Sequence, residues 1–371
     1  MPDGELISVT INDGIRKFSE LGRHDNSNDD KSKYKKVCIG DIAYNSMRMW
    51  QGASGYSPYE GIVSPAYTVL SPNSGVNSKC LAYQFKLPGM IHTFQINSQG
   101  ITSDNWNLKY PALSEIEIFV STYEEEQAKI AEYFENFDRL ITFHQQKITL
   151  LTKLKKAMLE KMFPKKGTVI PEFRFNGFAN AWEQRKLNEV LSFLKDGTHG
   201  THADDENGPL LLSAKNIKNG KIICDETDRR ISEEEYEKIH TNFSLEVGDV
   251  LLTIVGSIGE TAILKDCSSI TFQRSVAFLR PNGTITSDFL YSEIQTQKFQ
   301  NELDSRKSTS AQPGIYLGDL SEVPIVFTTN LDEQTKIGDY FNNLDHLITL
   351  HQRKLDMLKK LKSACLSEMF I

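Results

Sequence analysis

The 371-residue sequence lacks the features of a secreted or membrane-spanning protein. No N-terminal run joins a basic start to an apolar stretch and a small-residue cleavage site. The most apolar window, around Val250–Ile263, is too short for a bilayer and is broken by two glycines and a glutamate. The cysteines are odd in number and never spaced as a metal knuckle or a redox pair: Cys38, Cys80, Cys224, Cys267 and Cys365. We therefore expect a soluble, cytoplasmic protein with free thiols.

The sequence also lacks motifs for chemistry of its own. No two prolines are adjacent, which excludes the Pro-Pro turn that adenine methyltransferases use to hold a flipped base. The Gly-Lys pair Gly220-Lys221 is followed by Ile222, whereas a nucleotide-binding P-loop needs Ser or Thr there. We expect no catalytic residue and no bound cofactor in this chain.

Two kinds of cluster resemble metal ligands but have simpler explanations. We place the acidic runs Glu124–Glu126 and Glu233–Glu235 at helix starts, where carboxylates interact favourably with the helix dipole. His199 and His202 are expected to be loop residues rather than metal ligands. The sequence therefore predicts no metal site.

Basic residues are fewer than acidic ones, and the formal net charge is −7. Phosphate neutralisation dominates affinity for nucleic acid, so this balance counts against a chain that wraps nucleic acid unaided. A role at DNA must therefore use local basic surface or partner subunits.

What the chain does contain is one segment twice. A shift of 207 positions aligns Glu126–Phe163 with Glu333–Phe370 without a gap, and 22 of 38 positions are identical. Each copy has a strand-like lead-in, Ile116–Val120 in the first, followed by a long amphipathic helix. Such identity over a helix of this length indicates an internal duplication.

Apolar residues recur every seven positions in both helices, which predicts that they pair as an antiparallel coiled coil. His144 and His351 interrupt the stripe at matched places near the helix midpoints, where antiparallel packing would bring them together. Two hydrogen-bonded core histidines are the favoured interpretation, and a pH-sensitive or metal role is the alternative. The predicted pairing residues are Ile130, Phe134, Phe137, Ile141, His144, Leu151, Ile337, Phe341, Leu344, Ile348, His351 and Leu358.

The segments before the two helices differ but share a skeleton of short apolar runs bounded by Gly, Asn and Pro, which is typical of strands and turns. Gly40-Asp41-Ile42 corresponds to Gly248-Asp249-Val250. The second globule opens with Trp182–Leu187 about thirty residues before Leu211, whereas the first reaches Leu6 almost at once. We therefore expect the first globule to lack this opening segment. We predict an α+β fold with an internal pseudo-twofold repeat, divided into a first globule (1–123), a first helix (124–163), a connector (164–181), a second globule (182–330) and a second helix (331–371).

At this point the residues match a known family. Two divergent globules, each followed by a near-identical helix with Glu-Gln-x-x-Ile, Asp-x-x-Ile-Thr-x-His-Gln and Lys-Leu-Lys, resemble the specificity subunit of type I restriction–modification systems. Trp182–Leu187 looks like the usual opening of its target recognition domain. The lead-in Ile116–Val120 departs from the family, which usually has prolines there, and the second copy keeps Pro324. The shortened first globule puts its half-site reading in doubt.

The resemblance implies a non-catalytic subunit whose globules each read one half of a bipartite, asymmetric site in double-stranded DNA. The helices would set the spacer and dock two methyltransferase subunits, and restriction subunits would join through that core. S-adenosylmethionine, ATP and Mg would be bound by the partner subunits, giving an adenine-specific methyltransferase and ATP-dependent deoxyribonuclease.

Base reading needs Arg, Lys, Asn, Gln, Ser, Thr and His on supported loops, with aromatic residues beside them. The candidates in the first globule are Asn45, Arg48, Trp50, Gln51, Asn105, Trp106 and Lys109. The candidates in the second globule are Lys195, Thr198, His199, Lys215, Asn216, Gln273, Arg274, Lys307, Ser308 and Gln312. The alternative is a coiled-coil scaffold without sequence-specific DNA binding, but a scaffold has little reason to diversify its globules while keeping its helices.

Overall fold

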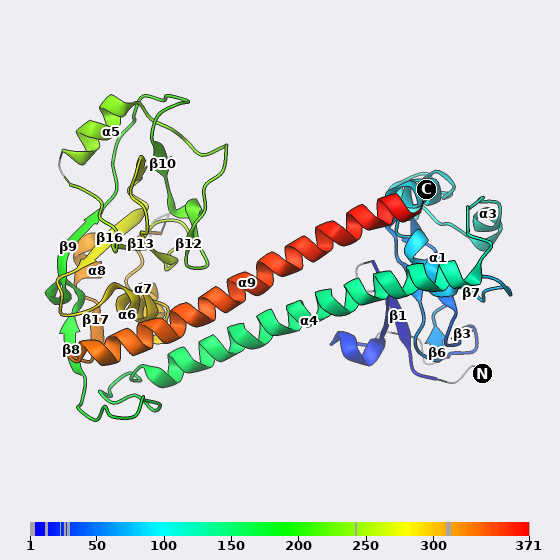
Figure 1. Ribbon diagram of the computed structural model, residues 1–371, viewed down its shortest axis with the longest axis horizontal. Coiled ribbons are helices and arrows are strands. Elements are labelled where there is room, and N and C mark those ends of the chain that lie inside the picture. The colour runs from blue at the N-terminus through cyan, green and yellow to red at the C-terminus, as the bar shows by residue number, and fades with distance from the viewer. Residues whose placement is uncertain are drawn as a thin grey trace. The chain divides into compact units, whose positions relative to one another are not determined.

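The computed structural model describes residues 4–11, 14–22, 24–25, 27, 30–241, 243–308 and 313–370. The chain forms two compact units: the first comprises residues 1–145 and 353–371, and the second comprises residues 146–352. Each unit therefore contains one globule, the adjoining half of its own long helix and the opposing half of the other long helix (Figure 1). None of the described helices has an apolar stretch long enough to cross a bilayer.

The first globule consists of short strands followed by three short helices. Its strands are β1 (Ile7–Thr10), β2 (Gly14–Lys17), β3 (Lys35–Val37), β4 (Ile42–Asn45), β5 (Ser54–Tyr56), β6 (Gly61–Val63) and β7 (Tyr67–Leu70). Its helices are α1 (Ser78–Gln84), α2 (Pro88–Ile96) and α3 (Tyr110–Ser114), with 3-10 turns at Phe18–Leu21, Met49–Gln51 and Ser103–Asn105. The central sheet has the order β5-β4-β7, and β1 with β2 and β3 with β6 form two antiparallel pairs beside it.

The second globule is larger. Its strands are β8 (Glu183–Lys186), β9 (Leu191–Asp196), β10 (Leu210–Leu212), β11 (Ile217–Lys218), β12 (Lys221–Ile222), β13 (Val250–Thr253), β14 (Thr261–Ile263), β15 (Ile270–Phe272), β16 (Val276–Pro281) and β17 (Pro324–Phe327). Its helices are α5 (Glu233–His240), α6 (Ser287–Ile294), α7 (Gln297–Ser305) and α8 (Leu317–Ser321), with 3-10 turns at Leu187–Val190 and Ala214–Asn216. The central sheet has the order β14-β13-β16-β9, β8 pairs with β17, and β10 pairs in parallel with β15.

The shared skeleton predicted for the globules is present. Both Gly40 and Gly248 have a φ of +98°, which favours glycine, and each precedes a buried aspartate at the start of a central strand. Asp41 accepts the backbone N–H of Cys38 at 2.8 Å, and Asp249 accepts that of Glu246 at 2.9 Å. These equivalent Gly-Asp turns precede β4 and β13, so the first strand of each pair of central strands begins with the same backbone turn.

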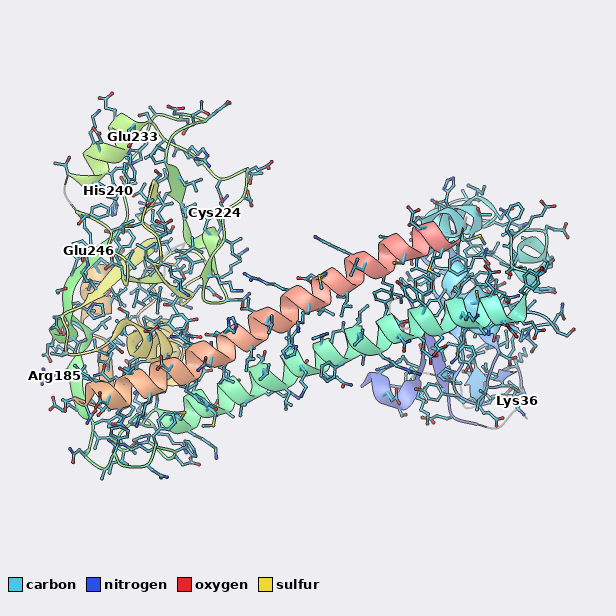
Figure 2. All side chains as sticks on the ribbon, in the orientation of Figure 1. Lys36, Arg185, Cys224, Glu233, His240 and Glu246 are labelled. Carbon is cyan, nitrogen blue, oxygen red and sulfur yellow. The ribbon has the colours of Figure 1, made fainter. Side chains whose placement is uncertain are left out.

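The two long helices are α4 (Glu124–Met162) and α9 (Leu331–Met369), as the repeat predicts. The acidic runs start α4 and α5, and Figure 2 labels Glu233 and His240 on α5. All twelve predicted pairing residues are buried or half-buried. Part of the stripe also packs against the helix's own globule. The ring centre of Phe134 lies 5.3 Å from that of Tyr83 of α1 and 6.1 Å from that of Phe370, the residue directly after α9. Of the two predicted histidines, His144 is buried and His351 is half-buried, and their pairing stays a prediction.

In the second unit, an ion pair joins the two helices. Lys155 of α4 donates to both carboxylate oxygens of Asp345 of α9 at 2.6 and 2.7 Å, and to Gln295 at 2.6 Å. Tyr291 of α6 donates its hydroxyl to the same carboxylate at 3.1 Å. Burial raises the pKa of Tyr291 far above its usual range, and the charge of Asp345 raises this pKa further. Asp345 of α9 therefore contacts both the other long helix and helix α6 of the globule.

The first unit repeats this arrangement with the helices exchanged. Lys362 of α9 donates to Asp138 of α4 at 2.5 Å, and Tyr83 of α1 donates to that carboxylate at 2.7 Å. Lys362 and Asp138 occupy the positions that correspond to Lys155 and Asp345 under the 207-residue shift. In the first unit Phe134 lies beside Phe370 and Asp138 beside Lys362, and in the second Phe163 lies beside Phe341 and Lys155 beside Asp345, so the two helices run antiparallel within each unit.

A buried glutamine attaches each globule to the start of its long helix. Gln127 accepts the backbone N–H of Asn77, which caps α1, and Gln334 accepts that of Thr286, which caps α6, both at 2.7 Å. Each side-chain amide also donates to two backbone carbonyls. These acceptors are Gly75 and Ser121 in the first unit and Thr284 and Thr328 in the second.

The predicted lead-in strand forms only in the second copy. Pro324–Phe327 pairs with Glu183–Lys186, whereas Glu117–Val120 is not a strand. Our prediction for the first copy was therefore wrong. The physical reason is that a strand needs a hydrogen-bonding neighbour, and no described residue pairs with this segment.

Candidate nucleic-acid interface

In the first unit, the candidate residues form one surface built from two loops. The turn after β4 carries Arg48 and Trp50, and the loop before α3 carries Trp106. The indole rings of Trp50 and Trp106 meet edge to face with centres 5.1 Å apart. Leu108 donates its backbone N–H to Ser46 at 2.8 Å, which fixes the second loop against the first. The structure thus brings together residues about sixty positions apart in the sequence.

Several polar groups of this surface already form hydrogen bonds with neighbouring residues. Asn45 accepts the backbone N–H of Met47 at 3.0 Å, and Trp50 donates its indole N–H to the carbonyl of the same residue at 3.1 Å. Arg48 is exposed and donates to Gln51 at 3.1 Å. Asn105 and Lys109 are exposed, and Asn105 donates to Thr102 at 3.2 Å. Trp50 and Asn45 therefore hold the loop in shape, while Arg48, Asn105 and Lys109 are the exposed candidates.

A half-buried lysine, Lys86, lies against the backbone of this surface. Lys86 donates to the carbonyl of Gly52 at 2.5 Å, directly after the Arg48–Gln51 turn, and to that of Ile11 at 3.2 Å. Burial, together with repulsion from Lys362, lowers the pKa of Lys86 to about 8. Sequence reasoning did not identify Lys86, because nothing in its neighbours signals burial.

In the second unit, the candidates converge from four loops around Ser275. Thr198 forms a parallel β-bridge with Gln273, which places the loop after β9 beside the Gln273–Arg274 turn. Ser275 accepts the N–H of Ala214 on its hydroxyl at 3.0 Å and the N–H of Ile254 on its carbonyl at 2.9 Å. The first bond anchors the Lys215 turn. The second anchors the end of β13, and the Ser308 loop attaches there because Val255 bridges to Gly314. Ser275 was not among the predicted residues.

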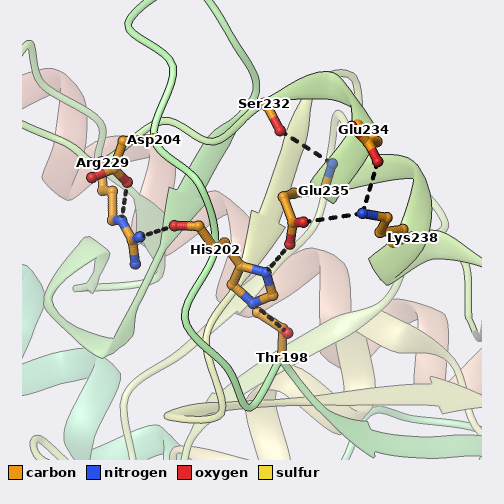
Figure 3. A network of polar contacts seen from close by, with 8 residues as sticks. All are labelled: Thr198, His202, Asp204, Arg229, Ser232, Glu234, Glu235 and Lys238. Atoms are coloured by element: carbon orange, nitrogen blue, oxygen red, sulfur yellow. Dashed lines mark hydrogen bonds and ion pairs between the residues drawn. The ribbon is translucent and has the colours of Figure 1, made fainter.

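A polar network holds the loop after β9 in place (Figure 3). His202, whose side chain is 9% exposed, contacts Thr198 through Nε2 and Glu235 through Nδ1, both at 2.8 Å. The hydrogen bond from His202, and also the charge and hydrogen bond of Lys238, keep the pKa of Glu235 below its usual range. Arg229 donates to Asp204 and to the carbonyl of His202, both at 2.6 Å. His202 therefore positions Thr198 from beneath the surface.

Asn216 lies inside the unit and not on the predicted surface. It is 3% exposed, and its amide bonds to Ser213, Ile223 and Asp228 at 2.9 Å each. A base contact by Asn216 would require breaking these bonds, so the structure makes it a residue that shapes the Lys215 turn. Gln312 lies outside the described residues.

The basic side chains of this surface differ in the contacts that they already make. Lys215 pairs with Asp228 at 2.8 Å, and Lys307 pairs with Asp304 at 2.5 Å. His199 contacts Asp196 at 2.6 Å, and Lys195 lies 4.5 Å from the ring centre of Phe243. By contrast, the guanidinium of Arg274 is exposed and makes no observed hydrogen bond or ion pair with another described residue. A ligand that binds the guanidinium of Arg274 would therefore break no observed contact of that group.

The Lys215 turn rests on a buried carboxylate. Burial raises the pKa of Asp228, but hydrogen bonds from Lys215, Asn216 and the backbone of Asp225 outweigh it and hold the pKa at about 2. Asp228 is therefore ionised at neutral pH, and the same contact raises the pKa of Lys215. In the described part of the chain, no three His, Cys, Asp or Glu side chains gather in a way that could hold a metal ion.

Comparisons with known proteins agree with this architecture. The model of the type I restriction modification DNA specificity domain matches residues 15–153 and 180–360. The MjaVIII type I restriction enzyme specificity subunit of Methanocaldococcus jannaschii is 26% identical over 354 residues, which cover 89% of this chain and 80% of that protein. The putative MjaX specificity subunit of the same organism is 24% identical over 195 residues, or 51% of this chain and 45% of that protein.

Solved structures share the fold. The crystal structure of a type I restriction–modification S subunit from M. genitalium has a TM-score of 0.63 at 16% identity, covering 100% of this chain and 90% of that one. A chain from a study of type I complex assembly and conformational transition has a TM-score of 0.52 at 17% identity, covering 99% and 91%. Since the two family matches span most of the chain and fall on its two halves, the chain belongs to the type I restriction–modification DNA specificity family, as its non-catalytic target-recognition subunit.

Proposed function

We propose that the surface around Arg48, Trp106 and Lys109 reads one half of a bipartite, asymmetric site in double-stranded DNA. The surface around Thr198, Gln273 and Arg274 reads the other half. In this proposal residues 1–123 and 182–330 are the recognition domains, joined by the connector 164–181. The helices 124–163 and 331–371 set the unread spacer.

The observation that carries this proposal is that the two units hold their long helices through equivalent polar contacts but have different loop surfaces. The Lys–Asp–Tyr contacts and the glutamine attachment recur in both units with the same partners. The supports of the candidate surfaces differ: two tryptophans pack together in the first, and His202 holds the loop after β9 in the second. Equivalent helix contacts fit the docking of two copies of one partner subunit. Different loop surfaces fit the recognition of two different DNA sequences.

The partners would be two methyltransferase subunits docked through the equivalent helix faces, with restriction subunits joining through that core. S-adenosylmethionine, ATP and Mg would be bound by those subunits, in the cytoplasm. Because the net charge is −7 and most cations of the second surface are already paired, we expect the chain alone to bind DNA weakly and with strong salt dependence. Tight specific binding is expected only in the complex.

The test is to co-express the chain with its methyltransferase subunit and to map methylated adenines by long-read sequencing. A split, asymmetric motif is the expected result. Arg48→Ala should relax the preference in one half of the motif and Arg274→Ala in the other, each by about 1–3 kcal/mol per lost base contact. The two variants control for each other, because each must leave the second half unchanged. If either variant relaxed the base preference in both halves of the motif, the assignment of one half-site to each globule would be wrong.

A further inference from the structure

The backbone of Thr198 is held on both sides, so its side chain has a fixed place on the second candidate surface. Its N–H donates to the carbonyl of Phe272 at 2.9 Å, and its carbonyl accepts the N–H of Arg274 at 3.0 Å. Gly197, the residue before it, lies so close to β15 and the following turn that an added Cβ would collide with the carbonyl oxygens of Phe272 and Gln273. The direction of the O–H bond of Thr198 is therefore the choice that remains.

The direction of that bond is set from the far side of the imidazole ring of His202. Nδ1 of His202 lies 2.8 Å from Oε2 of Glu235, and Nε2 lies 2.8 Å from the hydroxyl of Thr198 (Figure 3). Glu235 stands in the first turn of α5, where Ser232 caps the helix by accepting the N–H of Glu235 at 3.3 Å. The pKa of Glu235 is below its usual range because the carboxylate accepts hydrogen bonds from His202 and Lys238. Glu235 is therefore ionised at neutral pH and can only accept a hydrogen bond.

These contacts leave the neutral imidazole of His202 with one tautomer. Nδ1 must carry the ring proton, because its partner is a carboxylate that has no proton to donate. Nε2 then has only a lone pair, so the hydroxyl of Thr198 must donate its proton to Nε2. A threonine hydroxyl has one proton and two lone pairs. The oxygen of Thr198 therefore keeps a lone pair, and no proton, for an incoming group.

The edges of the bases in the major groove differ in whether they donate or accept. Adenine and cytosine present an exocyclic amino group, which donates, whereas guanine and thymine present a carbonyl oxygen, which accepts. A threonine whose hydroxyl is free can contact either kind. Thr198 is half-buried, and among the described residues His202 is the observed partner of its hydroxyl. With its proton held by His202, Thr198 fits the amino group and would place a lone pair against the carbonyl oxygen.

We propose that Thr198 accepts a hydrogen bond from the exocyclic amino group of an adenine or cytosine at one base pair of the second half-site. The inference rests on the proposed function of this surface and adds the class of base that one residue selects. His202 and Glu235 are positioning residues, because they contact no base and act by fixing the proton of Thr198. A carbonyl oxygen at that place would require Thr198 to release His202, whose side chain is 9% exposed, and would leave Nε2 without its partner.

The first step of the experiment identifies the base pair that Thr198 reads. The full chain is co-expressed with its methyltransferase subunit, and methylated adenines are mapped for Thr198→Val, which keeps the shape of threonine but has no hydroxyl. We expect one base pair in one half of the motif to relax. Thr198→Ala also lacks the hydroxyl and should give the same result. Thr198→Ser keeps the hydroxyl and is the matched control, so its motif should stay unchanged.

The second step asks which atom of that base pair Thr198 contacts. Fluorescence polarisation of the complex at pH 8, where an imidazole is ordinarily neutral, compares two altered duplexes. One lacks the amino group of the adenine or cytosine, and the other lacks the carbonyl oxygen of the guanine or thymine paired with it. Loss of the amino group should weaken binding by the unchanged complex about threefold to tenfold more than binding by the Thr198→Val complex, which is the worth of one hydrogen bond. Loss of the carbonyl oxygen should weaken both complexes equally.

The outcomes separate this inference from the proposed function. A split motif in which Thr198→Val and Thr198→Ala relax no base pair would overturn the inference and leave the function standing. So would a dependence of Thr198 on the carbonyl oxygen instead of the amino group, because the hydroxyl would then be the donor. Equal weakening at every position of the second half-site would also overturn the inference, since Thr198 would then only support the loop. Absence of a split motif would overturn both.

Discussion

Replacing Lys155 by methionine tests how the long helices are held together. The change keeps the apolar stem of the side chain but removes three hydrogen bonds and leaves Asp345 without its cation. The side chains of this pair are 13% and 28% exposed, whereas those of Lys362 and Asp138 are 20% and 45% exposed. Breaking a buried pair costs about 3–5 kcal/mol and an exposed one about 1 kcal/mol or less. We expect losses of about 2–3 kcal/mol for Lys155→Met and about 1 kcal/mol for Lys362→Met.

The two units can be followed separately because their tryptophans differ. Trp182 reports on the second unit, and Trp50 and Trp106 report on the first. Urea unfolding would be measured by fluorescence in a W50F/W106F background for Lys155→Met and in a W182F background for Lys362→Met. Adding Asp345→Asn or Asp138→Asn completes two double-mutant cycles, which isolate the pair from the loss of packing. A coupling energy for Lys362–Asp138 equal to or larger than that for Lys155–Asp345 would refute the reasoning from burial.

Three further predictions address stability and function. Gln334→Leu leaves the N–H of Thr286 and two carbonyls without a partner and should cost the second unit about 3 kcal/mol in urea unfolding; an unchanged midpoint would contradict this. Between pH 8 and 10.5 the unfolded state holds the proton of Lys86 more often than the folded state, so stability of the first unit should rise by about 2 kcal/mol across that window, and Lys86→Met should remove this rise. His202→Phe breaks the contacts to Thr198 and Glu235 and should weaken recognition of the second half-site about tenfold in methylation assays, with the first half unaffected.

The repeat was sufficient to predict the architecture. A seven-residue apolar period over 38 aligned positions depends only on local helix geometry, so α4 and α9 follow from it directly. The turns at Gly40 and Gly248 were equally predictable, since the backbone conformation there favours glycine. The polar contacts between the long helices and the globules were not predictable, because nothing in the sequence distinguishes Asp345 or Gln334 from solvent-exposed residues of the same helix.

The contacts that build the candidate surfaces could not be predicted from the sequence. The pairing of Trp50 with Trp106 and the position of Ser275 depend on contacts between loops far apart in the chain, which periodicity does not encode. Asn216 has the composition of a reading residue but the surroundings of a buried one. The exposed lead-in at Phe119 was missed because the local pattern there is that of a strand, although no described strand pairs with it.

The tyrosine contacts at Asp138 and Asp345 also bear on how such a protein can change. Each globule offers its long helix one tyrosine hydroxyl and one capped helix end, and the helix supplies the aspartate and the glutamine that receive them. A foreign globule that brings those two features could be grafted onto either helix without redesign of the helix pair. The same helix pair could therefore carry different globules, provided that each brings the tyrosine and the capped helix end.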